Sequence, residues 1–206
     1  VMATGDTDIS ICSDALILLG STTISSFSEG TDLASACSRL YPDLRDTLIS
    51  RYPWSWSLKK VKLARLATAP LNEWKYAYQL PGSILTGVIA LFSSGSASAT
   101  SLNYGWELYD DQVYTNLETV YIDYQTTIAE SDLPVYFVRM LRTALAGELA
   151  IPVTDQTQKA DYFRTMAVGT PGESGRGGLF REAANIDSRG QINKVVQDYS
   201  LIAVRN

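Results

Sequence analysis

The chain of 206 residues contains no histidine and only two cysteines. Histidine is the commonest general base near neutral pH and a usual zinc ligand, so its absence excludes histidine-dependent triads and ordinary zinc sites. Cys12 and Cys37 both fall on the apolar stripe of an expected helix. That position favours two buried free thiols over the alternative, a disulfide between them. We therefore expect no metal ion and no cofactor.

An excess of basic charge and a long apolar run are also lacking. The formal net charge of −5 argues against a DNA coat or a groove-reading factor, although it leaves room for a wall past which DNA slides. No run approaches the roughly 20 apolar residues of a membrane span, and residues 1–8 are too short and polar for a signal peptide. We expect no membrane contact, and a protein used in the cytoplasm or carried out inside a larger particle.

Helical periodicity occupies the first quarter of the chain. Apolar residues over 8–19 share one helical face, and Gly20 stands where a left-handed cap belongs. A second helix is expected from Thr31 or Asp32 to before Tyr52, with a kink or a split at Pro42. Together these two helices predict the start of a bundle.

Helices return in the last third of the chain. Asp132 and Pro134 predict the start of a helix that runs to about Ala150, where Ile151-Pro152 is expected to break it. Thr154 is then expected to cap a further helix that ends near Gly169. These segments are expected to complete the bundle.

Between these helices the apolar residues recur at every second position, as in a β-strand. Apolar and polar residues alternate in several short runs between Trp54 and Tyr124, which predicts an antiparallel region of four to six strands. Asp110-Asp111 is typical of a turn, and residues 93–101 (SSGSASATS) predict an exposed loop. The order helices, strands, helices predicts an α+β fold, a helical bundle with an inserted antiparallel β-region and an extended C-terminal arm. The expected divisions are 1–53, 54–130, 131–169 and 170–206.

The C-terminal arm, residues 170–206, opens with TPGESGRGG, which is too rich in glycine to favour regular structure. Its apolar residues are too many for a solvated tail, so we expect an extended arm that docks on a partner, with plain disorder as the alternative. The expected contact residues are basic or apolar: Arg176, Leu179, Phe180, Arg181, Ile186, Arg189, Val195, Tyr199, Leu201 and Ile202.

Tests for catalytic or binding motifs favour no chemistry. The glycine run at 169–178 lacks the Lys and Ser/Thr of a phosphate loop. Carboxylates near aromatic residues leave a glycan hydrolase as an open but weaker hypothesis, and those considered are Asp43, Asp46, Glu73, Asp110 and Asp111. One basic run could contact nucleic acid, but a solvated strand edge or a patch meeting an acidic neighbour is favoured; it consists of Lys59, Lys60, Lys62 and Arg65.

Six short segments together carry a family resemblance. They are ALILLG at 15–20; Tyr41 with Arg45-Asp46 and Pro53-Trp54; Trp74, Tyr76, Tyr78 and Leu80-Pro81; the expected hairpin 109–116; YIDY at 121–124; and LAGELAIPVT at 145–154. In this order, the chain resembles the tail tubular protein A family of short-tailed phages, which are head-to-tail adaptors. The resemblance runs from about residue 8 to residue 169.

The resemblance implies a structural virion protein of the phage tail without enzymatic activity, assembled in the host cytoplasm. Copies would form a ring, twelvefold in the family, between the portal protein and the tail nozzle. The ring would close the portal after DNA packaging, carry the nozzle and fibres, and let DNA pass without specific binding. Three alternatives stay open: a head–tail connector of a long-tailed phage, a tail-borne glycan hydrolase, and a bacterial scaffold protein.

Overall fold

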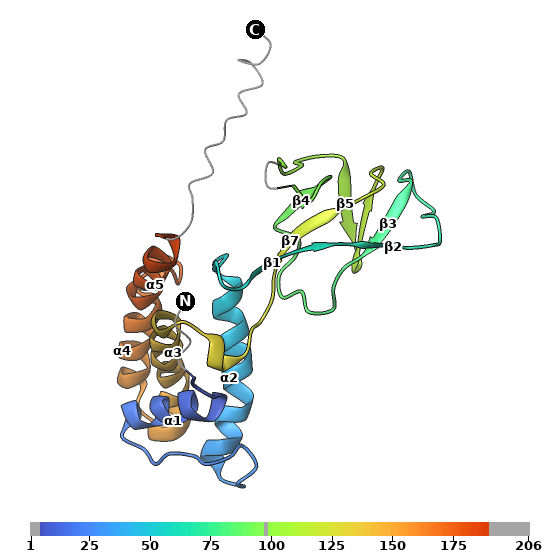
Figure 1. The fold of residues 1–206 in the computed structure, drawn as a ribbon. Helices are drawn as coiled ribbons and strands as arrows, with labels where there is room; N and C mark the ends of the chain where they lie inside the picture. Colours follow the sequence, from blue (N-terminus) through green and yellow to red (C-terminus); the bar gives the residue numbers. More distant parts are fainter. Residues whose placement is uncertain (1–4, 97–98, 190–206) are drawn as a thin grey trace, which may run out of the picture.

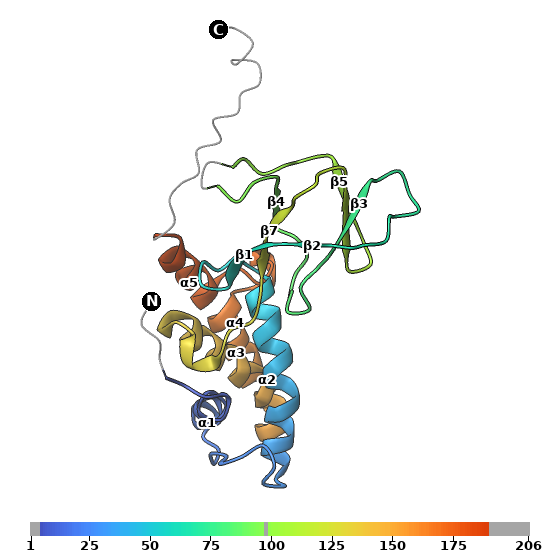
Figure 2. The same ribbon diagram turned by 45° about the vertical axis from the view of Figure 1, so that its right-hand side comes forward.

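A computed structural model describes residues 5–96 and 99–189 of the chain (Figures 1 and 2). Helices from both ends of the chain pack into one bundle, and the strands between them form a β-region beyond the C-terminal end of α2 (Figure 1). The predicted α+β fold, a helical bundle with an inserted antiparallel β-region, is confirmed.

The bundle is built around α3, which contacts each of the other helices. Its helices are α1 (Asp8–Leu19), α2 (Asp32–Ser50), α3 (Val135–Thr154), α4 (Thr157–Val168) and α5 (Gly178–Ser188). Buried side chains occupy nearly the whole circumference of α3, as expected for a helix that is surrounded by others. One apolar core joins all five helices and includes the segment that leaves α2.

Local sequence signals fix the first two helices. Thr7 accepts a hydrogen bond from the Ser10 N–H at the start of α1, and Gly20 ends this helix in the left-handed conformation. Thr31 caps α2 in the same way through the Ala34 N–H. Pro42 is exposed and α2 continues through it as one helix, so the chain does not split there.

The break between α3 and α4 lies later than the sequence predicts. Helix α3 continues through Pro152 to Thr154, and the chain turns at Asp155, whose φ is 53°. Pro152 removes only one hydrogen bond, and its exposed position near the helix end leaves the freed carbonyl close to water. Thr154 is therefore the last residue of α3, and Gln156 takes the N-cap position of α4.

The start of the C-terminal arm also differs from the prediction. Residues 178–188 form helix α5 instead of an extended segment, because Phe180, Ala183 and Asp187 recur at helical spacing and are buried on one face. Only the short 3-10 turn Pro171–Glu173 interrupts the glycine run that precedes α5. The predicted arm beyond residue 189 lies outside the described residues.

The β-region contains two antiparallel sheets among the described residues. Their strand orders are β1-β7-β4 and β2-β3-β6-β5. The strands are β1 (Leu58–Lys62), β2 (Ala64–Arg65), β3 (Tyr76–Gln79), β4 (Ala90–Phe92), β5 (Trp106–Tyr109), β6 (Gln112–Thr115) and β7 (Tyr121–Gln125). The predicted turn at Asp110-Asp111 joins β5 to β6, with Asp110 at a φ of 47°.

The β-region has a core of its own, separate from that of the bundle. Tyr78, Leu91, Val113 and Ile122 are its central buried side chains. Tyr78 of β3 and the nearby Leu80 are buried, whereas Tyr76 and Trp74 are half-buried and Trp74 donates from Nε1 to the carboxylate of Glu107 at 3.0 Å. The chain passes between the bundle and the β-region twice. The contacts at this junction therefore set the position of the β-region relative to the bundle.

The junction and the candidate assembly surfaces

An aromatic cluster fills the side of the junction that belongs to the bundle. Trp54 is fully buried, and its ring centroid lies 5.3 Å from that of Phe137 on α3 and 5.5 Å from that of Phe180 on α5. Tyr52 and Trp56 pack on the same indole. The chain that leaves α2 for the β-region is thereby anchored to the bundle before it enters β1.

Gln125, the last residue of β7, ties the returning chain to the outgoing one. The two N–H groups of its side-chain Nε2 are shared among three acceptors: the carbonyl of Ile49 at 2.6 Å, that of Tyr52 at 2.7 Å and the hydroxyl of Ser57 at 3.0 Å. The end of α2 thus receives from a strand the donors that it lacks after its last turn. Buried polar groups of this kind require a unique arrangement, because an unpaired carbonyl in the interior is costly.

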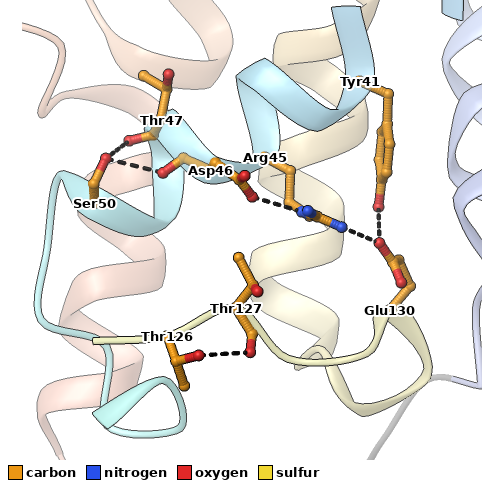
Figure 3. Close-up of polar contacts among 8 residues, drawn as sticks. All are labelled: Tyr41, Arg45, Asp46, Thr47, Ser50, Thr126, Thr127 and Glu130. Atoms are coloured by element: carbon orange, nitrogen blue, oxygen red, sulfur yellow. Dashed lines mark hydrogen bonds and ion pairs between the residues drawn. The ribbon is translucent and has the colours of Figure 1, made fainter. Parts of the chain in front are cut away.

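Glu130 attaches the returning chain to the middle of α2 (Figure 3). Its carboxylate forms an ion pair with Arg45 and accepts a hydrogen bond from the hydroxyl of Tyr41 at 3.4 Å. Arg45 also donates from Nε to Asp46 at 2.8 Å. Burial raises the pKa of Tyr41, and the neighbouring charge of Glu130 raises it further.

Asp187 on α5 holds the outgoing chain. One carboxylate oxygen accepts from the Ser55 N–H at 2.8 Å; the other accepts from the Ser55 hydroxyl at 2.7 Å and the Tyr136 hydroxyl at 2.8 Å. Burial, followed by the hydrogen bond to Asp187, raises the pKa of Tyr136. No sequence pattern predicts the role of Asp187, since its partner Ser55 is far away in the chain and shares no motif with it.

The structure places the predicted contact residues of the C-terminal arm in different environments. Phe180 is 2% exposed and belongs to the bundle core, so it is no surface residue. Arg176, Arg181, Ile186 and Arg189 are exposed on or beside α5, and their predicted contact role remains untested. Leu179 is half-buried, and four of the predicted residues lie outside the described ranges: Val195, Tyr199, Leu201 and Ile202.

The glycine run holds an internal carboxylate. Glu173 accepts from the Thr170 N–H at 2.9 Å and from Arg181 at 2.7 Å. The Thr170 N–H in particular lowers the pKa of Glu173 below its usual value. The carboxylate of Glu173 therefore closes this turn from within, and the glycines allow the tight loop that precedes α5.

The carboxylates considered for hydrolysis are not gathered into one site. Asp110 and Asp111 occupy the exposed β5–β6 turn, and Glu73 is exposed ahead of β3. Asp43 is exposed on α2, one turn from Asp46, which pairs with Arg45. Among the described residues, no three His, Cys, Asp or Glu side chains are grouped to hold a metal ion.

The basic run lies on the edge strands β1 and β2 and is partly engaged within the β-region. Lys60 pairs with Asp123 at 3.2 Å and lies 3.5 Å from the centroid of the Phe92 ring. Arg65 stacks over Tyr76 at 5.0 Å. Lys59 and Lys62 are exposed. Lysines on edge strands discourage unwanted pairing with other strands, which fits the interpretation as a solvated edge.

Large apolar side chains are exposed on both the bundle and the β-region. On α4, Tyr162 is 61% exposed and Met166 follows one turn later; both line a shallow groove of about 520 Å³. In and beside β5, Tyr104, Leu108 and Tyr109 are exposed. Exposed apolar patches of this kind mark interaction surfaces in soluble proteins. These are the candidate assembly surfaces that sequence patterns did not single out.

Comparisons with known proteins add little to this description. No family model matches the sequence, and no curated protein matches it. One solved structure that is similar is described as the neck of an empty GTA particle computed with C6 symmetry. It is 18% identical, with 71% of this chain and 82% of that chain covered, and the TM-score is 0.27. A likeness at this level carries no argument about fold or function. Within residues 5–96 and 99–189, no helix has the length and apolar character to cross a membrane.

Proposed function

We propose that this protein is a structural component of a phage-like particle, a head-to-tail adaptor similar to tail tubular protein A. Copies form a ring between the portal protein and the tail nozzle, close the portal after DNA packaging, and carry the nozzle and fibres. The protein catalyses no reaction in this role. Its net charge of −5 suits a ring that DNA passes without binding.

The observation that supports the proposal best is where the six resembling segments fall. Each lies on an element or junction of one bundle with an insertion: the end of α1, the length of α2 and its exit, β3, the β5–β6 hairpin, β7, and the second half of α3. The six segments are therefore distributed over both the bundle and the β-region, as expected if the resemblance covers the whole fold.

The exposed apolar surfaces support assembly with other chains. A closed ring is built from head-to-tail contacts, which require two different faces on every subunit. The α4 surface with Tyr162 and Met166 lies on the bundle, whereas the β5 surface with Tyr104 and Tyr109 lies on the β-region. We assign the α4 surface to one of the two faces between copies and the β5 surface to the nozzle or fibres. The exposed residues Ile186 and Arg189 of α5 are proposed to face the portal.

The test is to mix the purified protein with its cognate portal ring and image the product by negative-stain electron microscopy. We expect a closed collar stacked on the portal. The double variant Tyr162→Ser with Met166→Ser should stay folded and fail to form the collar, and Leu71→Ser, which changes another exposed apolar side chain, should form it normally. A folded, monodisperse protein that never associates with portals would overturn the adaptor role.

The remaining alternatives predict different results. A tail-borne hydrolase would cleave a host polysaccharide, and a single carboxylate change, such as Asp111→Asn, would abolish the cleavage. A connector of a long-tailed phage usually lacks so large a β-insertion, so the β-region favours the short-tailed adaptor. A collar that forms with the portal but does not recruit the nozzle would favour the long-tailed connector.

A further inference from the structure

The β-region is connected to the bundle by two chain segments, and a carboxylate pins each of them. The returning segment is attached to α2 through Glu130 and Arg45. The outgoing segment is attached to α5 through Asp187 and Ser55. The angle between bundle and β-region therefore depends on two helices that come from opposite ends of the chain (Figure 2).

Asp187 makes an unusually complete attachment for one side chain. The residue is 5% exposed, and its two oxygens accept from a backbone N–H and two hydroxyl groups at 2.7–2.8 Å. Two of these donors belong to Ser55, so both the backbone and the side chain of that residue are fixed. Hydrogen bonds to a charged acceptor are stronger than those between neutral groups.

The attachment reaches the β-region over a very short distance along the chain. Ser55 is three residues before Leu58, where β1 begins, and β1 pairs with β7 along its whole length. Ser57 lies between Ser55 and Leu58. Its N–H donates to the carbonyl of Trp54, and its carbonyl accepts from the N–H of Thr126. Ser55 is therefore linked to β1 through two intervening residues, one of which, Ser57, is hydrogen-bonded to the segment that follows β7.

Helix α5 is itself held in the bundle. It packs on α3 and α4, and its Phe180 packs on Trp54 in the outgoing segment. Asp187 therefore attaches the outgoing segment to a helix that belongs to the bundle core.

We propose that α5 sets the orientation of the β-region through Asp187, so that loss of this attachment releases the outgoing segment and lets the β-region reorient. Asp187 is a positioning residue in this device, and Ser55 is the group that it positions. The inference does not rest on the adaptor role.

The experiment measures the distance distribution between two spin labels, one on the bundle at Gln158→Cys and one on the β-region at Glu118→Cys. Both sites are exposed, and the native Cys12 and Cys37 are fully buried. In the full chain we expect a single narrow distribution, and Asp187→Asn should widen it at least twofold. The matched control Glu182→Gln removes an exposed charge from the same helix and should leave the distribution narrow.

Two milder variants keep the test decisive if Asp187→Asn fails to fold. Ser55→Ala and Tyr136→Phe each remove one hydroxyl that donates to Asp187, and Ser55→Ala should widen the distribution more because Ser55 leads into β1. An unchanged distribution in folded Asp187→Asn, or in folded Ser55→Ala, would overturn the proposal. Equal widening in Glu182→Gln would overturn it as well, since the effect would then come from helix charge alone.

Discussion

The ring of Phe180 meets the ring of Trp54 edge-on, with centroids 5.5 Å apart and an angle of 68° between the planes. The contact joins the last described helix to the segment that leaves α2. Both side chains are buried, and Phe137 of α3 packs on the same indole. Helix α5 is consequently part of the folded core, and removal of residues 169–206 would remove core side chains together with the predicted arm.

Replacement of this buried ring should destabilise the whole bundle. We expect Phe180→Ala to lower the free energy of unfolding by about 3–5 kcal/mol, because a buried aromatic side chain is lost and a cavity is left. The measurement is chemical denaturation followed by circular dichroism. Ile186→Ala on the exposed side of α5 is the control and should cost much less. Equal small losses for the two variants would show that α5 is not packed on the core.

The hydroxyl of Tyr41 should make stability depend on alkaline pH. Burial and the charge of Glu130 raise the pKa of Tyr41 above its unfolded value of about 10. Below about pH 10 this hydroxyl contributes fully to the free energy of unfolding. As the pH rises further the contribution is lost, and the free energy of unfolding falls by at most about 1.4 kcal/mol per pH unit.

Denaturation curves at pH 8 to 10.5 check this expectation by comparison with Tyr41→Phe. The variant is less stable near pH 8, because Glu130 loses a hydrogen-bond donor. The gap should narrow above about pH 10, since only the wild-type chain can ionise this group when it unfolds. Tyr162→Phe, which removes an exposed hydroxyl, is the control. Parallel curves for wild type and Tyr41→Phe would contradict the assigned environment.

Gly147 allows α3 and α4 to approach closely. A Cβ atom at this position would lie 3.1 Å from the backbone nitrogen of Arg164 and 3.5 Å from the carbonyl oxygen of Ala160. We expect Gly147→Val to lower the free energy of unfolding by about 1–3 kcal/mol, because backbone cannot yield as a flexible side chain does. Gly82→Val is the control, since nothing lies within 4 Å of its Cβ position. Thermal unfolding of both variants gives the comparison, and a neutral Gly147→Val would refute the close packing.

The two cysteines should be unreactive in the folded protein. Cys12 and Cys37 are fully buried as free thiols, as the sequence predicts, and the hydrogen bond with Cys37 together with burial raises the pKa of Cys12. Reaction with a thiol-specific chromogenic disulfide should therefore require unfolding, because only the exposed thiolate attacks. Ser35→Cys, at an exposed site of α2, adds a thiol that should react at once. Rapid modification of wild-type thiols would contradict the burial.

Helices and turns with local signals could be predicted from the sequence. The stripe of α1 with Gly20 after it, and the Asp110-Asp111 turn, depend on neighbouring residues alone, and both are where the pattern places them. The end of α3 could not be predicted, because the effect of Pro152 depends on its exposed position near the helix end, where the carbonyl that loses its hydrogen bond is close to water. Helix α5 carried a usable signal in the spacing of Phe180, Ala183 and Asp187, which the adjacent glycines obscured.

The junction was beyond prediction for a different reason. Gln125 reaches Ile49, and Asp187 reaches Ser55, between segments that are remote in sequence and share no motif. Side chains such as Gln and Asp are ordinarily surface residues, so their burial depends on partners that only the complete fold supplies. The exposure of Tyr162 and Met166 on α4 could not be predicted either, since apolar side chains at this spacing fit a buried helix face as well as an exposed one.

The insertion of the β-region also has a consequence for the order of folding. Helices α1 and α2 meet α3 only after the entire β-region has been closed into a loop between them. Closing a long flexible loop costs conformational entropy and slows folding, whereas α3, α4 and α5 are neighbours along the chain. We therefore expect α3, α4 and α5 to pack together first. Pairing of the strands within the β-region lowers the entropy cost of closing this loop, because β1 and β7 then bring the end of α2 close to the start of α3.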